Sequence, residues 1–230
     1  MELTRETFAR MIDHTLLKPD ARRGDIRRLC AEAVAWGFGA VCVNPAYVPL
    51  AVWELVGSGV KVCTVIGFPL GATSITTKVA ETEQAARDGA VEFDLVPHLG
   101  ALKEGDAAYL EDELRRVISA ARSVAAGAVV KVILETALLT EEEKRFGCRL
   151  AVACGADFMK TSTGFGPGGA TEADVRLLRA AVGDRLGVKA AGGIRDLATA
   201  LRMIAAGANR IGTSSGVRLM QEWGEKERYL

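Results

Sequence analysis

Two lysines stand where buried, strand-forming residues are expected. Lys160 ends the run "GADFMK", and Lys189 lies inside "GVKAA" with apolar residues on both sides. Lysine is rarely fully buried without a partner, because removing its ammonium from water is costly. Burial and a nearby positive charge both favour the neutral amine, which attacks carbonyl carbons and forms Schiff bases. The alternative is that these lysines pair with carboxylates or extend their ammonium groups to solvent at the strand ends.

The segments that carry the lysines recur along the chain. A helical stretch ends at a glycine and an apolar run rich in Val and Ile follows, with the marking glycines at Gly37, Gly59, Gly89, Gly127, Gly155, Gly187 and Gly207. Glycine suits the position just past a helix because it adopts left-handed backbone angles without a Cβ clash. With a first strand in "MIDHTLL", the pattern predicts eight strands, at residues 11–16, 39–44, 61–66, 91–96, 129–134, 156–161, 187–191 and 208–213.

Eight strands separated by helices predict an α/β fold, a single (β/α)8 TIM barrel with a short N-terminal helix. We expect one domain over residues 1–230, since barrels of this length commonly form one domain. The alternative is an open, doubly wound sheet. Helix starts are predicted at Thr140, where "TEEE" fits a capping box with Glu143, and at Thr171.

Composition argues against several classes of protein. Lys+Arg and Asp+Glu both total 29, so neither a nucleic acid nor a membrane is expected as a partner. The charged start "MELTRETFARMIDHT" predicts no signal peptide, and no run is long enough for a membrane helix. Five cysteines without CxxC spacing predict reduced thiols in the cytoplasm.

Metal and cysteine chemistry are also disfavoured. His14 and His98 lack the spacing of a metal site, and no cysteine cluster has zinc spacing, so we expect no metal and no cofactor. A catalytic cysteine is an alternative, with one of these two histidines as its base.

In a barrel of this kind the reaction site lies at the C-terminal ends of the strands. The polar residues predicted there are Asp13, Thr15, Cys42, Asn44, Asp94, Lys131, Glu135, Lys160, Thr161 and Lys189. We expect Asp94, Lys160 and Lys189 to converge on one cavity, with the lysines side by side on neighbouring strands. A lysine pKa lowered by ~3 units leaves roughly a quarter of the amines neutral at pH 7.

Glycines and serines in the last two loops predict an anion site. "AAGGIRD" follows the seventh strand, and "GTSSG" follows the eighth, where barrels commonly bind phosphate. Backbone N–H groups and hydroxyls at a helix N-terminus favour negative charge. "STGFGPGG" is expected to wall the same pocket, although ordinary turns are the alternative for each glycine run. The candidate phosphate contacts are Gly164, Gly192, Gly193, Gly212, Ser214 and Ser215.

Several motifs together resemble the deoxyribose-phosphate aldolase family. They are "DHTLLKPD", "VCVNPAYV", "VIGFPLG", "EFDLV", "KVILET", "FMKTSTGF", "VKAAGGIRD" and "RIGTSSG", in the family's order and over nearly the whole chain. The resemblance implies a class I (β/α)8 aldolase that interconverts 2-deoxy-D-ribose 5-phosphate with acetaldehyde and D-glyceraldehyde 3-phosphate. It also implies a homo-oligomer, a dimer or a tetramer, whose ligands are small phosphosugars and aldehydes.

Carried over by position, the resemblance implies roles for individual residues. Lys160 would form the Schiff base, Lys189 would keep it reactive and assist proton transfer, and Asp94 would act with Lys189 through water. The predicted substrate contacts beyond the phosphate site are Asp13, Thr15, Cys42, Lys131 and Thr161.

The chain departs from the family pattern at two places, and its tail carries a tyrosine. Pro97 and His98 follow "EFDLV"; we expect His98 to face solvent, and contact with the substrate is the alternative. Gly166 and Pro167 intervene after "STGF", which changes the loop and its phosphate contacts rather than the lysines. Tyr229 is penultimate; a tail tyrosine assists proton transfer in some family members, and a disordered end is the alternative.

Two other functions compete with this one. An aldolase for a different phosphosugar, of transaldolase type, would keep Lys160 and alter the pocket around Asp94 and His98. A phosphosugar-binding protein would bind ligand without turnover, and it has no use for two buried lysines. A panel of phosphosugar substrates distinguishes the first alternative from the deoxyribose-phosphate aldolase. An assay of turnover distinguishes the second, because a binding protein does not convert its ligand.

Overall fold

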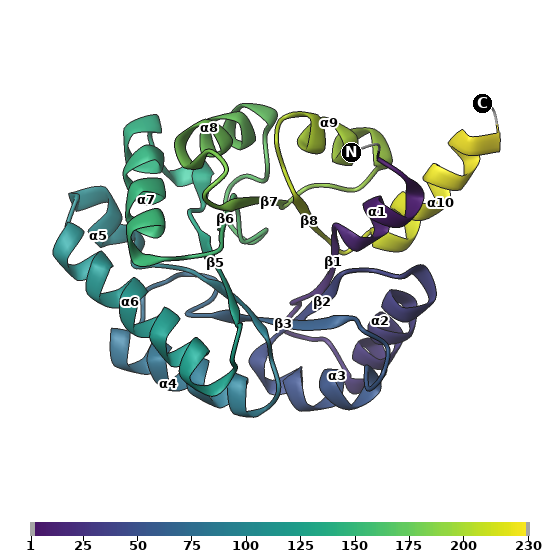
Figure 1. Cartoon of the computed structure of the whole chain (residues 1–230), viewed down its shortest axis with the longest axis horizontal. Coiled ribbons are helices and arrows are strands. Elements are labelled where there is room, and N and C mark those ends of the chain that lie inside the picture. The colour runs from purple at the N-terminus through teal and green to yellow at the C-terminus, as the bar shows by residue number, and fades with distance from the viewer. Residues whose placement is uncertain (1–2, 229–230) are drawn as a thin grey trace.

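Eight parallel strands close into a barrel that a ring of helices surrounds (Figure 1). The computed structural model describes residues 3–228. Each strand pairs with the next one in the chain, and β1 pairs with β8. The strands are β1 (Ile12–Leu16), β2 (Ala40–Val43), β3 (Lys61–Ile66), β4 (Glu92–Leu95), β5 (Val129–Ile133), β6 (Phe158–Lys160), β7 (Gly187–Ala191) and β8 (Arg210–Thr213).

Helices follow the strands and form the outer layer. They are α1 (Arg5–Arg10), α2 (Arg23–Trp36), α3 (Val48–Glu54), α4 (Ile75–Arg87), α5 (Leu99–Glu104), α6 (Ala107–Val124), α7 (Glu141–Cys154), α8 (Glu172–Val182), α9 (Leu197–Ala205) and α10 (Gly216–Arg228). Two 3₁₀ turns, η1 (Pro45–Tyr47) and η2 (Thr136–Leu138), lie in the loops after β2 and β5. Within residues 3–228, none of the helices combines the length and the apolar character that crossing a bilayer requires.

The predicted barrel is confirmed, and the open sheet is wrong because β1 and β8 close the ring. The short N-terminal helix is α1, and each strand lies within two residues of its predicted bounds. Thr140 and Glu143 form the expected capping box, and Thr171 caps α8. The separate helix α5 and both 3₁₀ turns were not expected, since short turns leave no period in the sequence.

One of the seven marking glycines has a different role. Six of them adopt positive φ, as expected for residues just past a helix. Gly187 instead begins β7, and the left-handed residue after α8 is Gly183, with φ 57°. A Cβ on Gly187 would lie 2.1 Å from the Phe158 ring, so this glycine is required by close packing of β7 on β6.

Side chains alternate between the helix layer and the interior of the barrel. The outward-facing residues are apolar and join the main core, as with Val41, Phe93, Val130, Met159, Val188 and Ile211. The inward-facing residues at period two are mostly polar, namely Asp13, Cys42, Cys63, Asp94, Lys131, Lys160, Lys189 and Arg210. The barrel interior is therefore built from polar and charged side chains that must pair with one another through hydrogen bonds and ion pairs.

The contact at Gly187 makes a testable prediction. We expect Gly187→Ala to lower the free energy of unfolding by about 1–3 kcal/mol, because the added methyl group overlaps the Phe158 ring. Gly24→Ala is the control, since a Cβ at that helical position meets nothing within 4 Å, and it should be neutral or stabilise by up to about 1 kcal/mol. Urea unfolding at a fixed protein concentration measures both. Equal effects would contradict the packing role.

Candidate active site

The carboxylate of Asp94 accepts hydrogen bonds from three buried lysines. Its Oδ2 lies 2.8 Å from Lys160 Nζ and 2.7 Å from Lys189 Nζ, and its Oδ1 lies 2.9 Å from Lys131 Nζ. The strand register explains the convergence, because Asp94 stands opposite Lys131 and Lys160 stands opposite Lys189. All four side chains are at most 3% exposed.

Three further charged residues lie beneath these four. Asp13 Oδ2 is 2.6 Å from Lys189 Nζ, and Glu92 Oε2 is 2.6 Å from Lys131 Nζ. Arg210 then joins both carboxylates, at 2.6 Å from Asp13 Oδ1 and 2.8 Å from Glu92 Oε2. We call these seven residues the charge cluster: Asp13, Glu92, Asp94, Lys131, Lys160, Lys189 and Arg210.

Opposite charges keep most of the charge cluster ionised despite burial. Burial raises the pKa of Asp94, but the ammonium groups of Lys131, Lys160 and Lys189 outweigh it, so this pKa is well below its usual range. Burial lowers the pKa of Lys189, but Asp13 and Asp94 outweigh it and the pKa is raised. The pKa of Lys131 is also raised, by Asp94 and other anionic neighbours against the effect of burial. Lys189 and Lys131 are therefore cations, not nucleophiles.

Lys160 differs from the other two lysines in its contacts. Its amine pairs with one carboxylate, whereas Lys189 pairs with two and Lys131 with three, the third being Asp13 at 3.9 Å. Lys160 also lines a cavity of about 370 Å³ at the C-terminal mouth of the barrel, and the other two lysines do not. Pairing with carboxylates thus accounts fully for Lys131 and Lys189, while Lys160 is paired and also accessible.

The cavity brings together half of the predicted site residues. Those that line it are Thr15, Lys160, Gly164, Gly192, Gly193, Gly212 and Ser214. The predicted residues outside its lining are Asp13, Cys42, Asp94, Lys131, Thr161, Lys189 and Ser215. Asp13, Asp94, Lys131 and Lys189 belong to the charge cluster below the cavity floor.

The other three residues outside the lining have identifiable contacts. Cys42 packs in the barrel interior against Cys63 and Val65. The Thr161 hydroxyl donates to the Ala191 carbonyl oxygen at 3.0 Å and accepts from the Ala191 N–H at 3.1 Å. The Ser215 N–H donates to Thr213 Oγ1 at 2.9 Å, directly before α10. Thr161 therefore ties the end of β6 to β7, while Ser215 shapes the turn.

One wall of the cavity suits an anion. Gly192 and Gly193 have φ values of 92° and 78°, which glycine adopts readily and which turn their backbone into a tight loop. Two exposed cations, Lys18 and Arg195, line the same cavity. Sequence reasoning missed both, although each lies within four residues of the end of a barrel strand, as residues of such a site do.

Glu135 fixes the loop after β6, which also lines the cavity. This buried residue follows β5 with φ 52°, in the left-handed region that non-glycine residues rarely adopt. Its carboxylate accepts hydrogen bonds from the hydroxyl and the N–H of Thr163, which lines the cavity. A Cβ on Gly166 would lie 2.7 Å from the Glu135 carboxyl carbon. The glycine at this departure from the family pattern therefore lets the loop approach the carboxylate.

Both histidines are engaged away from the cysteines. His14 Nε2 lies 2.6 Å from Glu32 Oε2, and its ring packs edge-on against Phe38. His98 caps α5, with Nδ1 accepting from the Ala101 N–H at 3.0 Å. The expectation that His98 simply faces solvent is wrong, because it is half-buried and its ring packs against Tyr109. These contacts give no support to a histidine-activated cysteine.

Within residues 3–228, two groups of side chains have the spacing of metal ligands. They are Cys42, Cys63 and Asp94, and Asp13, Cys63 and Glu92, with ligand atoms within 4.8 Å of one another. However, Lys131 already neutralises both carboxylate regions, at 2.9 Å from Asp94 and 2.6 Å from Glu92. A divalent ion there would face several ammonium groups, so the donor set does not fit a metal.

Lys160 is almost fully buried, yet its side chain lines the cavity above the charge cluster. The comparison with known families agrees with this arrangement. A family model described as DeoC/LacD family aldolase matches residues 7–222. The chain belongs to this family. The resemblance expected from the sequence motifs is thereby confirmed. The tail residue Tyr229 lies outside the described residues.

Members of the family with curated names cover nearly the whole chain. The deoxyribose-phosphate aldolase of Thermoanaerobacter sp. (strain X514) is 55% identical over 218 residues, which span 95% of this chain and 97% of the relative. That of Thermococcus gammatolerans is 57% identical over 216 residues, spanning 93% and 95%.

Solved structures of the family share the fold. A putative deoxyribose-phosphate aldolase from Coccidioides immitis has a TM-score of 0.92 at 40% identity, covering 96% of this chain and 87% of the other. The deoxyribose phosphate aldolase of Aeropyrum pernix, described as having a unique tetrameric structure, has a TM-score of 0.90 at 36% identity and covers 97% and 93%.

The contact between Glu135 and the loop makes a second prediction. We expect Thr163→Val to lower the free energy of unfolding by about 1–3 kcal/mol, because it leaves a buried carboxylate without its hydroxyl donor. Thr163→Ser keeps the hydroxyl and should cost about 1 kcal/mol or less, for one methyl group. Chemical unfolding of the two variants side by side gives the answer, and a Val variant as stable as the Ser variant would show that the hydroxyl is dispensable.

Proposed function

We propose that this protein is a deoxyribose-phosphate aldolase in which Lys160 is the Schiff-base lysine. The observation that carries the assignment is that, of three lysines sharing the Asp94 carboxylate, Lys160 alone lines the cavity. The activity is reversible cleavage of 2-deoxy-D-ribose 5-phosphate into D-glyceraldehyde 3-phosphate and acetaldehyde. Named relatives at about 55% identity over nearly the full chain support the same reaction.

The chemistry follows from a neutral amine at the cavity floor. The nitrogen of Lys160 attacks the aldehyde carbon C1 of the open-chain sugar, and loss of water leaves an iminium. The iminium withdraws the electron pair of the C2–C3 bond as the C3 hydroxyl gives up its proton, which releases D-glyceraldehyde 3-phosphate. The remaining enamine takes a proton at C2, and hydrolysis of the new iminium then frees acetaldehyde and the amine.

Proton transfers in this sequence are assigned to the neighbours of Lys160. Asp94 accepts from both Lys160 and Lys189 through one oxygen, so a proton can pass between these groups through water. The Lys189 ammonium also supplies positive charge beside the reacting nitrogen, which favours the unprotonated amine. Asp13 and Lys131 hold Lys189 and Asp94 in place from below, instead of contacting substrate.

The phosphate group is assigned to the glycine and serine side of the cavity. Gly192, Gly193 and Ser214 offer backbone N–H groups and a hydroxyl, and Lys18 and Arg195 offer charge at the rim. Thr15, Gly164 and Gly212 complete the lining around the sugar.

The protein is further proposed to be a cytoplasmic homo-oligomer, a dimer or a tetramer. All five cysteines are free and buried, which suits a reducing compartment. Exposed apolar side chains on the outer surface, Trp53 at 69% and Val56 at 80%, support association between subunits. Light scattering coupled to size exclusion determines the number of subunits.

Borohydride trapping tests the nucleophile. With 2-deoxyribose 5-phosphate present, reduction should leave a substrate-derived mass on the peptide that contains Lys160, because the iminium is converted to a stable amine. Lys160→Ala should lose both the adduct and turnover while keeping its fold, as judged by circular dichroism. An adduct on Lys189 would reverse the roles of the two lysines, and no adduct in a protein that binds the sugar would favour a binding protein.

Lys189→Leu tests the neighbouring charge. We expect activity to fall by about 10²-fold or more, and the remaining activity to require a higher pH, because Lys160 keeps its proton more readily once the adjacent cation is gone. A pH profile of kcat/KM measures both effects. Full activity of this variant at neutral pH would contradict the proposed activation.

Ser214→Asp tests the phosphate wall. Like charges facing each other cost several kcal/mol, so kcat/KM for 2-deoxyribose 5-phosphate should fall by about 10²-fold. Unphosphorylated 2-deoxyribose meets no such repulsion and should be affected far less. A similar loss with both sugars would place the phosphate elsewhere.

A further inference from the structure

The charge cluster contains one more cation than anion when every member is ionised. Its cations are Lys131, Lys160, Lys189 and Arg210, and its anions are Asp13, Glu92 and Asp94. An uncompensated charge in the protein interior is costly, so the cluster is most stable when one cation gives up its proton. The arginine cannot do so in a protein.

Contacts decide which of the three lysines is the surplus cation. Lys131 and Lys189 are held by several carboxylates, and Lys160 is held by Asp94 alone. Lys160 is also the member of the three that lines the substrate cavity. Loss of a proton from Lys160 leaves three cations facing three carboxylates.

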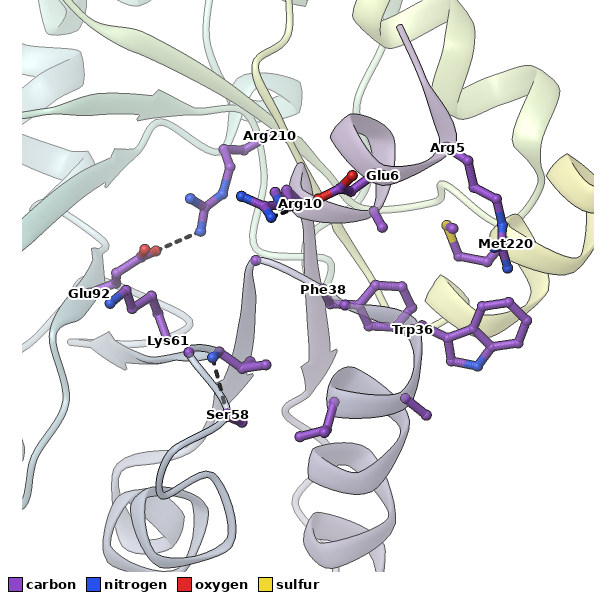
Figure 2. A pocket seen from close by; sticks show the side chains of 17 residues that line it. Arg5, Glu6, Arg10, Trp36, Phe38, Ser58, Lys61, Glu92, Arg210 and Met220 are labelled. Atoms are coloured by element: carbon purple, nitrogen blue, oxygen red, sulfur yellow. Dashed lines mark hydrogen bonds and ion pairs between the residues drawn. The ribbon is translucent and has the colours of Figure 1, made fainter.

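Arg210 is the member that makes this count uneven, and it lies at the opposite end of the barrel. Together with Glu92 it lines a cavity of about 730 Å³ at the N-terminal mouth, where Figure 2 shows the two side chains joined by an ion pair. Neither residue lines the cavity that contains Lys160. Arg210 reaches Lys160 through two routes, by Asp13 and Lys189 or by Glu92 and Lys131, and both end at Asp94.

We propose that Arg210 is a positioning residue of the aldolase reaction, whose half-buried positive charge makes Lys160 the surplus cation and so provides the neutral amine. This inference rests on the proposed function. It assigns to the remote end of the barrel a share of the activation that the adjacent Lys189 alone would otherwise supply. Without Arg210, three protonated lysines would balance three carboxylates, and Lys160 would keep its proton.

The other titratable groups that face the barrel interior are two thiols, Cys42 and Cys63, which stay the same in every variant proposed below. Every strand contributes one or more titratable or charged residues: Asp13 from β1, Cys42 from β2, Cys63 from β3, Glu92 and Asp94 from β4, Lys131 from β5, Lys160 from β6, Lys189 from β7 and Arg210 from β8. Burial raises the pKa of the Cys63 thiol well above its usual value, so it is neutral. A hydrogen bond from the Cys63 thiol lowers the pKa of the Cys42 thiol, against the effect of burial.

Two substitutions that remove charges of opposite sign test the proposal. The quantity measured is the position of the acid limb in the pH profile of kcat/KM. Arg210→Met removes a positive charge, so Lys160 holds its proton more tightly and the limb should move to higher pH by about one unit. Glu92→Gln removes a negative charge, so the limb should move to lower pH by a similar amount. The double variant Arg210→Met/Glu92→Gln restores the count and should return the limb to near the wild-type position.

Two further variants separate charge from structure. Arg210→Lys keeps the charge and should keep the wild-type limb. Arg10→Met removes a charge from the same cavity, but Arg10 is 71% exposed and pairs with exposed Glu6, so solvent screens it and no shift is expected.

The proteins should fold, because each single substitution leaves every remaining charge with an opposite partner. After loss of Arg210, Asp13 still pairs with Lys189 and Glu92 with Lys131. Thermal unfolding checks this for each variant. If Arg210→Met does not fold, Glu92→Gln decides alone, and a limb at the wild-type pH overturns the proposal.

The results distinguish this inference from the proposed function. Opposite shifts, cancelled in the double variant, support it. An Arg210→Met variant whose activity falls by the same factor at every pH overturns it and leaves a purely structural arginine. A wild-type protein that forms no borohydride adduct on Lys160 overturns both the function and the inference, whereas an adduct with unshifted profiles overturns the inference alone.

Discussion

The site depends on the sharing of one carboxylate by three amines. Asp94 is fully buried in the barrel interior, and its two oxygens accept hydrogen bonds from Lys131, Lys160 and Lys189. In such surroundings a charge has only its neighbours to stabilise it, so the protonation state of each group is fixed by the others. The outer helices and the apolar core behind the strands keep those neighbours at hydrogen-bonding distance. The side chains held in place by the fold thus take over from water the role of stabilising the charges around the reacting amine.

Much of this arrangement is contained in local sequence patterns. Glycines after helices and apolar runs predict eight strands, and the position of a polar residue within a strand predicts which mouth of the barrel it serves. Lys160, Lys189 and Asp94 are found this way because each interrupts an apolar run. Gly187 is the instructive error: its neighbours have the pattern of a helix end, yet it is required by the Phe158 ring, a contact between two strands that no local pattern contains.

The remaining features could not be predicted because they arise between distant residues. Glu92 and Arg210 have the composition of ordinary strand-end charges, and only the register of the closed barrel joins them to Lys131 and Asp13. Glu135 gives no sign in the sequence that its backbone is left-handed or that its carboxylate fixes Thr163. Lys131 was expected to contact substrate, and the structure instead places its amine among carboxylates below the cavity.

The closure of the barrel between β1 and β8 has a consequence for the order in which the protein is made. Asp13 enters the chain near its beginning, and its partner Arg210 follows 197 residues later. A ribosome that has produced seven strands has therefore exposed every catalytic lysine but not the last member of the charge cluster. The set of buried charges is complete only when the final strand joins the first, so a chain that stops short lacks a balanced interior as well as a closed wall. The proposed active site is therefore complete only after the last strand has been synthesised.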